Sequence, residues 1–486
     1  MIVGIDIGTG SLKVVVTDDA LTLRGEAARG YAVRYPRPGW AEQDPEIWED
    51  ALGPTIAAAL AHADVSPGAV KALGIAGQLD GCIPVGADGQ ALTPCLIWID
   101  RRAEQEVAAL PADTVRDLTG VVLDPIHMAA KIRWLKRRAP EARKAARFHQ
   151  PVSYLVSRLT GADVFDHGLA STTMLYALAD RAFDRRLLDL FEIDENELPA
   201  IAEASSCAGR LHAAGAQLTG LLEGIPVAVG TGDDFSNPLG AGLVAPGRMA
   251  CCLGTAEVVG ALDQEPKVDS RGLMETHSYA NDTYFIENPG WLSGGALAWF
   301  VETFRLRNFK ELDELASKVC PGVEGLIFLP ALGGAMAPEW QASARGCFYG
   351  LTPAHGTGHM ARAVLEGCAF AMRDVLERLR EMVVPVSSIL LLGGGASSHV
   401  WARIRADISA LPVELPVLAD TSPLGAAMLA AVAGAVQPDL MAAAELVGGT
   451  AETIEPSVKA QVAYEGAYAS YRRLFESVRP MFTQAP

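Results

Sequence analysis

The 486-residue sequence lacks the short motifs that identify several large classes of nucleotide-using and redox proteins. No Gly-Lys-Ser or Gly-Lys-Thr occurs, which excludes a Walker-type phosphate loop, and no His-Arg-Asp occurs, which excludes a protein-kinase catalytic loop. The eight cysteines include no Cys-x-x-Cys spacing, so we expect reduced thiols and a cytoplasmic protein.

Basic residues and long apolar runs are also scarce. With 58 acidic and 40 basic residues the formal net charge is −18, so the surface should repel a nucleic acid backbone and an anionic membrane. No apolar run is long enough to span a bilayer, and the first residues carry no basic segment followed by an apolar one, so we expect no membrane insertion or export. A small anionic ligand would therefore be held by backbone dipoles, hydroxyl groups and a divalent metal.

The length and the 50% hydrophobic content predict two or three domains with full cores. Strand-like runs such as Val3–Ile7 and Cys95–Ile99 alternate with helix-like stretches such as Met128–Arg138, and the second half repeats this plan. This alternation predicts α/β domains. The Val-Ala-Pro-Gly within Leu243–Gly247 is the expected boundary, which gives domains 1–244 and 245–486.

One pattern occurs twice, at Ile5–Val16 and at Ala250–Val259. Each copy is an apolar run, a Gly-Thr pair and a second apolar run, which predicts two strands joined by a tight turn. A single turn of this kind usually only reverses the chain, but two of them could clamp a polyanion between backbone N–H groups and hydroxyls. The candidate phosphate-binding residues are Gly8, Thr9, Gly10, Ser11, Lys13, Gly254 and Thr255.

Two adjacent carboxylates, Asp233 and Asp234, follow the apolar run Ile225–Val229 on a glycine-rich turn. Capping of the next helix is the commoner task for Asp at such a place. A carboxylate can also orient an alcohol and accept its proton during phosphoryl transfer, which makes Asp233 the candidate catalytic base.

A polar cluster follows another predicted strand at Gly74–Gly81. Carboxylate and amide groups bind hydroxyls, and an indole face covers C–H bonds, so this cluster suits a polyhydroxylated ligand. Trp98 could equally belong to the core. The candidate substrate-binding residues are Gln78, Leu79, Asp80, Trp98, Asp100 and Asp234.

A third glycine-rich segment, Leu391–Ser398, runs from a strand into a helix. Its spacing is not Gly-x-Gly-x-x-Gly, so it is a weak dinucleotide signal. We expect a nucleoside to lie against its bare backbone, with Gly394, Gly395, Ala396 and Ser398 as the binding residues.

Several long motifs in order make the whole chain resemble the FGGY carbohydrate kinases, and most closely their xylulokinase branch. The motifs are Gly4–Thr9, Trp40–Trp48, Lys71–Gln78, Gly232–Asp233, Phe328–Pro330, Gly346–Leu351, His359–Glu366 and Leu392–Gly395. The resemblance implies a duplicated actin-like (ribonuclease H-like) ATPase fold, with ATP and sugar in the cleft between domains and Mg²⁺ on the phosphates. It also implies that Asp6 lies near the metal and that Asp233 is the base.

The chain departs from the xylulokinase pattern at three places. Gln78–Gly81 reads Gln-Leu-Asp-Gly instead of Gln-Met-His-Gly, Asp233-Asp234 replaces Asp-Asn, and Gly334–Pro338 reads Gly-Ala-Met-Ala-Pro instead of Gly-Glu-Arg-Thr-Pro. Each change alters hydrogen bonding or charge, and such changes can reject a ligand.

The expected activity is ATP-dependent phosphorylation of a terminal hydroxyl of a ketopentose, with D-xylulose first. The alternatives are another polyol or ketose (a tetritol, glycerol or ribulose) and, in a different class, an actin-like nucleotide-binding pseudokinase. The expected partner is a small sugar or polyol, with a homodimer as the candidate assembly.

Overall fold

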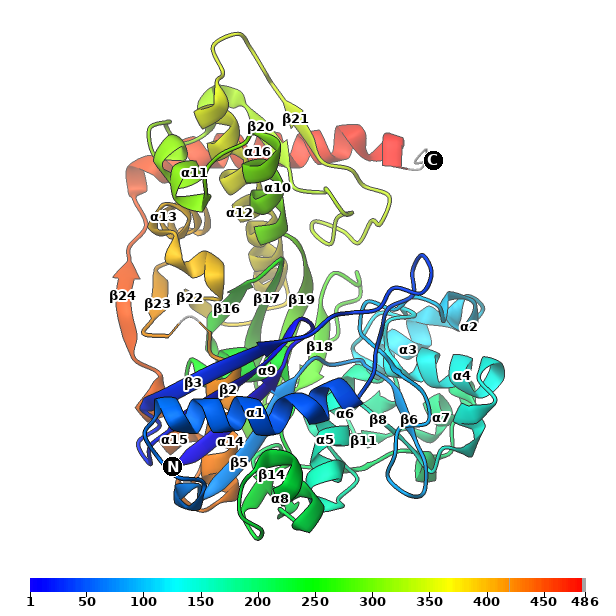
Figure 1. Ribbon diagram of the computed structural model, residues 1–486. Helices are drawn as coiled ribbons and strands as arrows, with labels where there is room; N and C mark the ends of the chain where they lie inside the picture. The colour runs from blue at the N-terminus through cyan, green and yellow to red at the C-terminus, as the bar shows by residue number, and fades with distance from the viewer. Residues whose placement is uncertain (419, 483–486) are drawn as a thin grey trace.

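The computed structural model describes residues 1–418 and 420–482, which form two lobes, each built around a seven-stranded sheet (Figure 1). The sheet of the lower lobe has the order β13-β14-β5-β1-β2-β3, with β15 beside β5. Its strands are β1 (Ile2–Ile7), β2 (Ser11–Thr17), β3 (Leu23–Gly30), β5 (Ala72–Gly77), β13 (Cys207–Arg210), β14 (Pro226–Ala228) and β15 (Thr231–Gly232).

The sheet of the upper lobe repeats the central part of this topology. Its order is β18-β19-β17-β16-β22-β23-β24. Its strands are β16 (Gly247–Leu253), β17 (Ala256–Asp263), β18 (Glu275–Ser278), β19 (Tyr284–Leu292), β22 (Val386–Leu392), β23 (Val413–Pro416) and β24 (Thr450–Ile454). In both sheets an antiparallel hairpin, β1-β2 or β16-β17, is followed by a parallel partner, β5 or β22. This is the predicted actin-like fold in duplicate.

Helices cover both faces of the lower sheet. Helix α1 (Glu46–His62) packs on β2 and β3, whereas α14 (Ser422–Ala433), drawn in orange in Figure 1, packs on β1 and β5 and against α9 (Asp233–Gly240). Small residues permit this close approach, because a Cβ at Gly4 would lie 2.0 Å from the Pro423 carbonyl oxygen and one at Gly74 would lie 2.0 Å from the Ala426 oxygen. The lower lobe therefore includes a helix from late in the chain.

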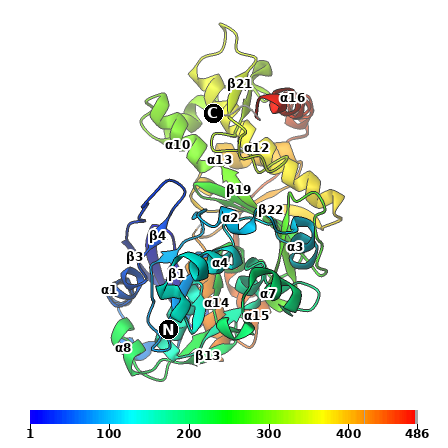
Figure 2. The same ribbon diagram turned by 90° about the vertical axis from the view of Figure 1, so that its right-hand side faces the viewer.

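The remaining helices belong to the two lobes, and Figure 2 shows α2, α3, α4 and α7 on the side of the lower lobe that lies at the right in Figure 1. In the lower lobe these are α2 (Glu104–Val107), α3 (Ala112–Thr119), α4 (Met128–Arg138), α5 (Pro151–Thr160), α6 (His167–Thr172), α7 (Arg185–Phe191) and α8 (Ala213–Thr219). The other helices of the second half are α10 (Gly294–Thr303), α11 (Phe309–Ala316), α12 (Thr357–Glu381), α13 (His399–Ser409), α15 (Leu440–Val447) and α16 (Val458–Phe482). Among the described residues, no helix is both long and apolar enough to cross a lipid bilayer.

Most predicted elements are confirmed, and α4 begins and ends at the predicted residues. The predicted strand Cys95–Ile99 is wrong in extent. Only β7 (Cys95–Leu96) is a strand, and the chain then turns because the Asp100 N–H donates to the Ile97 carbonyl. The domain limits 1–244 and 245–486 stay a prediction, although α9 ends at Gly240 and β16 begins at Gly247 on either side of the proposed boundary.

Candidate active site

Three predicted functional residues lie where neighbouring strands of the lower sheet end. Asp6 is paired with Ala76 across the parallel strands β1 and β5, and Gln78 follows β5 directly. The short strand β15 pairs with the end of β5 at Gly232 and Gly77, so Asp233 leaves the sheet beside Gln78. The carboxyl ends of parallel strands are the usual ligand-binding edge of such sheets.

The turn that carries Asp233 requires glycine. Gly230 has a φ of +81°, and a Cβ there would lie 2.2 Å from the Ile75 carbonyl oxygen. The Thr231 hydroxyl donates to Asp166 Oδ2 at 2.7 Å, and Asp166 is the N-cap of α6. This hydrogen bond holds the turn against α6. Helix α9 has Gly232 as its N-cap, with no side-chain cap, so Asp233 is the first helical residue and is not the cap.

The carbonyl oxygens of the first Gly-Thr turn accept hydrogen bonds from Tyr31 and Gln43. The Gly8 oxygen accepts from the Tyr31 hydroxyl at 2.6 Å, the Thr9 oxygen from Gln43 Nε2 at 2.7 Å, and the Gly10 oxygen from the Tyr31 N–H at 3.0 Å. These hydrogen bonds remove three carbonyl oxygens as sources of repulsion toward an anion.

A cavity of about 290 Å³, which we name the central cavity, lies against these strand ends. Residues from both halves of the chain line it: Thr9, Gln78, Leu79, Asp80, Trp98, Ile126, His127, Thr172, Asp233, Asp234, Ala256, Val258, Glu275, His277, Glu287, Pro289, Gly290 and Met336. Trp98 is 40% exposed and donates to the Thr9 hydroxyl at 2.9 Å, so it belongs to the cavity wall and not to the core.

The wall of the central cavity is rich in carboxylates. Asp80 and Asp234 come from the first half, and Glu275 and Glu287 come from β18 and β19. Burial first, and then the charges of Asp80 and Glu275, raise the pKa of Asp234 to about 7. An anionic substrate would therefore meet charge repulsion here.

Two histidines interleave with these carboxylates. His277 lies on β18 with Nε2 3.3 Å from Glu287 Oε1. His127 lies between Asp80 and Glu275; burial favours its neutral ring, but these two carboxylates raise the pKa of His127 well above its usual value. Burial likewise opposes ionisation of Glu275, but the contact with His127 lowers the pKa of Glu275 to about 2. This part of the wall is a buried ion cluster.

Several polar atoms of the cavity residues are buried without a hydrogen-bond partner among the described residues. They are Gln78 Oε1, Asp80 Oδ1, His127 Nε2 and Glu287 Oε2. Buried polar groups are normally paired, because an unmade hydrogen bond costs about 1–3 kcal/mol. A ligand rich in hydroxyl groups would supply the missing partners.

Sequence reasoning missed His127, Glu275, His277 and Glu287. A signal was present for two of them, because Glu275 and His277 are two residues apart and therefore point to one face of a strand. The third member of their cluster, His127, is far away in the sequence, and no local pattern connects it with β18.

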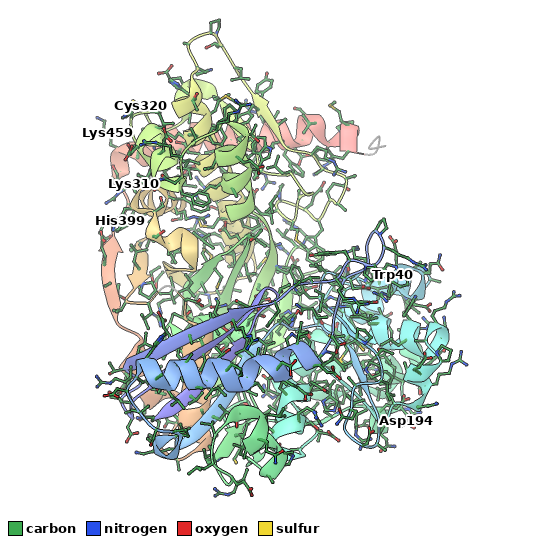
Figure 3. All side chains as sticks on the ribbon, viewed as in Figure 1. Trp40, Asp194, Lys310, Cys320, His399 and Lys459 are labelled. Atoms are coloured by element: carbon green, nitrogen blue, oxygen red, sulfur yellow. The ribbon has the colours of Figure 1, made fainter. Side chains whose placement is uncertain are left out.

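The second predicted turn lines a different cavity of about 620 Å³, which we name the glycine-lined pocket. Glycines from three separate segments line this pocket: Gly254, Gly294, Gly295, Gly394 and Gly395. The wall also contains Thr255, Lys310, Asp313, Ser398 and Trp401. Lys310, labelled in Figure 3, projects from the upper lobe near the start of α11. Backbone thus forms much of this wall.

Most of the predicted nucleoside-binding residues of Leu391–Ser398 lie at the glycine-lined pocket. Gly394, Gly395 and Ser398 line the glycine-lined pocket, but Ala396 is buried and does not. The Ser398 side chain caps α13 by accepting from the Trp401 N–H at 3.0 Å, and its hydroxyl donates to Asp313 at 2.9 Å. These two hydrogen bonds connect the start of α13 with Asp313 in the wall of the pocket.

Asp100 lies outside the central cavity, contrary to its predicted place among the substrate-binding residues. It is fully buried and accepts from the Ala41 N–H at 2.6 Å and from Arg102 Nη2 at 2.7 Å. Because the Ala41 N–H and Arg102 occupy the carboxylate oxygens, Asp100 connects these two segments instead of facing a ligand. The first-turn residues Gly8, Gly10, Ser11 and Lys13 also line neither cavity, and Lys13 pairs with Asp420 at 2.5 Å.

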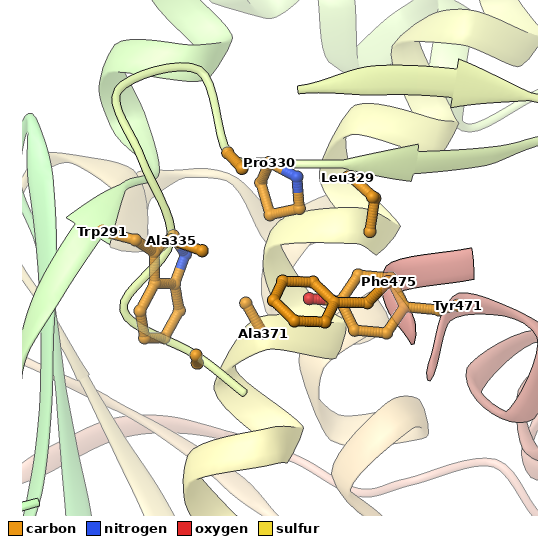
Figure 4. Close-up of a pocket in the computed structure, with 9 residues that line it drawn as sticks. Trp291, Leu329, Pro330, Ala335, Ala371, Tyr471 and Phe475 are labelled. Carbon is orange, nitrogen blue, oxygen red and sulfur yellow. The ribbon is translucent and has the colours of Figure 1, made fainter. Parts of the chain in front are cut away.

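A small apolar void in the upper lobe differs from both cavities. It has a volume of about 10 Å³ and lies between Trp291, Ala335, Ala371 and the rings of Tyr471 and Phe475 (Figure 4). Such a space holds at most one water, and its wall offers too few polar partners to bind one well. It is a packing defect beneath the Gly334–Pro338 segment.

The residues around Asp6 fit a divalent cation held largely through water. Asp6 is 5% exposed, and burial together with the nearby charge of Asp233 raises the pKa of Asp6 to about 7. A cation would relieve this repulsion between two carboxylates. Among the described residues, no group of three or more His, Cys, Asp or Glu side chains forms a metal site by itself, and Mg²⁺ usually keeps several waters.

Comparisons with known proteins cover 99% of the chain. Residues 1–240 match the N-terminal domain of the FGGY family of carbohydrate kinases, and residues 249–434 match the C-terminal domain of that family. The chain is 30% identical to the xylulose kinase of Escherichia coli over 490 residues, which cover 99% of this chain and 100% of that protein. It is also 30% identical to the glycerol kinase of Thermococcus kodakarensis over 460 residues, which cover 92% of this chain and 90% of that protein.

A solved structure gives the same result for the fold. The crystal structure of a xyloylose kinase from Brucella ovis matches 99% of both chains with a TM-score of 0.92 and 30% sequence identity. Because the two family models together match residues 1–240 and 249–434, the chain belongs to the FGGY family of carbohydrate kinases.

Proposed function

We propose that the protein transfers the γ-phosphoryl group of ATP to a terminal hydroxyl of a ketopentose or polyol bound in the central cavity. The observation that carries this proposal is the position of Asp233. It lines the central cavity, lies beside the Asp6 carboxylate, and is the first residue of α9. ATP would occupy the glycine-lined pocket, with its phosphates directed toward the two Gly-Thr turns.

Asp233 is the proposed general base. Burial and the adjacent charge of Asp234 raise the pKa of Asp233 to about 7, which suits proton transfer near neutral pH. In the loose transition state of phosphoryl transfer the alcohol loses its proton late, so orientation of the hydroxyl by the carboxylate matters as much as basicity. The alcohol proton moves to Asp233 as its oxygen bonds to phosphorus.

Asp6 is the residue that would hold Mg²⁺, through water, and the metal when bound neutralises charge on the phosphates. The Asp6 carboxylate is itself oriented by the Ser422 hydroxyl, which donates to Oδ1 at 3.0 Å. Ser422 begins α14, so the helix from the second half of the chain fixes a residue of the first strand.

D-xylulose is the first candidate acceptor, since a xylulose kinase is among the relatives that match the full chain. An alditol or glycerol is the second candidate. A specific observation favours it: two of the unpartnered atoms, Gln78 Oε1 and Asp80 Oδ1, are hydrogen-bond acceptors, and every oxygen of an alditol carries a donor hydrogen.

The test is product identification. The protein is incubated with ATP, Mg²⁺ and, separately, D-xylulose, D-ribulose, xylitol, erythritol or glycerol, and phosphorus NMR and mass spectrometry identify the product. We expect a terminal phosphomonoester of one neutral acceptor. ATP binding without any phosphorylated product would favour the nucleotide-binding pseudokinase.

A further inference from the structure

His127 is enclosed between two carboxylates that come from different halves of the chain. It lies immediately before α4 and is 1% exposed. Its Nδ1 is 3.1 Å from Asp80 Oδ2, and its Nε2 is 3.5 Å from Glu275 Oε1 on β18. Both lobes therefore hold one imidazole at the wall of the central cavity.

The two carboxylates are fixed by further contacts. The Asp80 N–H donates to Gln150 Oε1 at 2.8 Å, and the Asp80 carbonyl accepts from Lys131 Nζ at 2.7 Å. Glu275 Oε1 accepts from the Val122 N–H at 2.9 Å. The position of His127 is thus set before any ligand enters, which is the condition for precise recognition.

The group presents one donor and one acceptor to a ligand. Asp80 Oδ1 is buried without a hydrogen-bond partner among the described residues, and His127 Nε2 has only the 3.5 Å contact with Glu275, which is too loose to count as a hydrogen bond; both side chains line the central cavity. The Asp80 contact orders Nδ1 as a donor, and two flanking carboxylates favour the imidazolium, in which Nε2 also carries a hydrogen.

Charged groups from several elements surround His127. Asp80 follows β5, Glu275 and His277 lie on β18, Lys131 lies on α4 and Asp234 lies on α9. Lys131 donates to the backbone oxygens of Asp80 and Ile97, and burial lowers the pKa of Lys131, which weakens its positive charge. The carboxylates therefore dominate the environment of the imidazole.

We propose that Asp80, His127 and Glu275 form a specificity-determining triad, in which His127 Nε2 donates to one substrate oxygen and Asp80 Oδ1 accepts from a neighbouring hydroxyl. The proposal rests on the proposed function, because it takes the ligand of the central cavity to be a sugar or polyol. Glu275 does not touch the ligand in this scheme and acts by keeping His127 a double donor. It is a positioning residue.

The triad defines a substrate class. A donor beside an acceptor matches two neighbouring oxygens of which at least one is a hydroxyl, as in a vicinal diol or an α-hydroxy ketone. A carboxylate group offers no hydrogen to Asp80 and would be repelled by Asp80 and Glu275. The triad therefore selects neutral polyols and ketoses against sugar acids.

The first experiment measures binding without phosphoryl transfer. Isothermal titration calorimetry on the full-length protein, with no nucleotide, gives the Kd of D-xylulose, xylitol and D-xylonate. We expect at least one neutral ligand to bind tenfold or more tightly than D-xylonate, and His127→Leu, which has no donor, to weaken that ligand by about tenfold or more, the factor expected for a lost hydrogen bond to a charged donor. Tighter binding of D-xylonate, or an unchanged Kd in His127→Leu, would overturn the triad.

The second experiment separates positioning from a structural role through pH. Glu275→Gln removes one of the two carboxylates that keep His127 charged, so its Nε2 should lose the hydrogen as the pH rises. The Kd ratio of Glu275→Gln to wild type should increase by about tenfold between pH 6 and pH 9, whereas Glu275→Asp should keep the ratio nearly constant. A pH-independent ratio for Glu275→Gln would contradict the positioning role.

The control is Asp163→Asn, which removes the carboxylate beside a different buried imidazole, His149, at 3.3 Å and outside the central cavity. Its Kd ratio should stay near one at every pH. Thermal unfolding of each variant checks that the fold persists. Neutral-ligand binding that follows these expectations without any phosphorylated product would uphold the triad and contradict only the proposed kinase activity, while failure of the wild type to bind any of the three probes would count against the triad itself.

Discussion

The central cavity and the glycine-lined pocket lie on either side of the second Gly-Thr turn, yet they are built by opposite means. Side chains dominate the central cavity, where Asp80, Asp234, Glu275 and Glu287 surround two histidines. Backbone dominates the other pocket, where glycines from three segments form much of the wall. Side-chain charge can distinguish similar acceptors, whereas bare backbone suits a ligand that relatives have in common.

The second Gly-Thr turn and the strand β17 that follows it contribute to different sites. Gly254 and Thr255, immediately before β17, line the glycine-lined pocket, and Ala256 and Val258 of β17 line the central cavity. Glu257, between them, points the other way and forms a fully buried ion pair with Arg405 of α13 at 2.5 Å. A change on one side of this strand should therefore affect one substrate more than the other.

The largest expected effect is the loss of kcat on substitution of Asp233. Asp233→Asn removes the proposed proton acceptor with little change in size, so kcat should fall by at least about a hundredfold while ATP binding stays near normal. Steady-state kinetics and calorimetry measure the two quantities. The neighbouring variant Asp234→Asn is the matched control and should raise the KM of the acceptor more than it lowers kcat. A kcat of Asp233→Asn within about threefold of wild type would exclude Asp233 as the base.

A Mg²⁺ titration of an Asp6 variant tests whether Asp6 affects the metal and not the acceptor. Asp6→Asn should raise the Mg²⁺ concentration needed for half-maximal activity by about tenfold, because one charge that attracts the hydrated ion is lost. The acceptor Kd should change little, since Asp6 does not line the central cavity. Asp18→Asn, at an exposed turn, serves as the control. If the Mg²⁺ titration of Asp6→Asn matched that of wild type, Asp6 would only stabilise the hairpin.

A smaller effect is expected at the backbone wall of the glycine-lined pocket. A Cβ at Gly394 meets no protein atom within 4 Å, so Gly394→Ala should not disturb the fold, but its methyl group would occupy space that a nucleoside needs. We expect the KM for ATP to rise by about threefold to tenfold, with the acceptor KM unchanged. Gly356→Ala, equally free of neighbours but outside the pocket, is the control. Unchanged KM for ATP would mean that the nucleotide does not lie against Gly394.

The sequence predicted the backbone-lined site better than the side-chain site, for a physical reason. Glycine turns are local, so Gly254, Gly394 and Gly395 could be recognised within a few residues of a predicted strand, and all three line the glycine-lined pocket. The duplicated fold was predictable for the same reason, since each hairpin is a local pattern. The charged cluster is not local: Asp80, His127 and Glu275 meet only after both lobes have folded.

Asp100 shows the opposite failure. Its place after a predicted strand and beside Trp98 suggested a ligand contact, but the sequence could not reveal that Arg102 lies over the Trp40 ring at 3.7 Å and pairs with the Asp100 carboxylate. A polar residue at a strand end can equally face a ligand or close a loop, and only its three-dimensional partners decide between these roles.

Acceptor-dependent ADP release tests the proposed kinase activity most directly. The wild-type protein with ATP and Mg²⁺ is given D-xylulose, xylitol, glycerol or D-xylonate in a coupled assay, beside a reaction without acceptor. We predict that a neutral acceptor increases the rate of ADP release at least about tenfold. D-xylonate should not increase this rate, since the carboxylates of the central cavity repel an acid. ADP release that is the same with and without every neutral acceptor would contradict the proposed kinase activity.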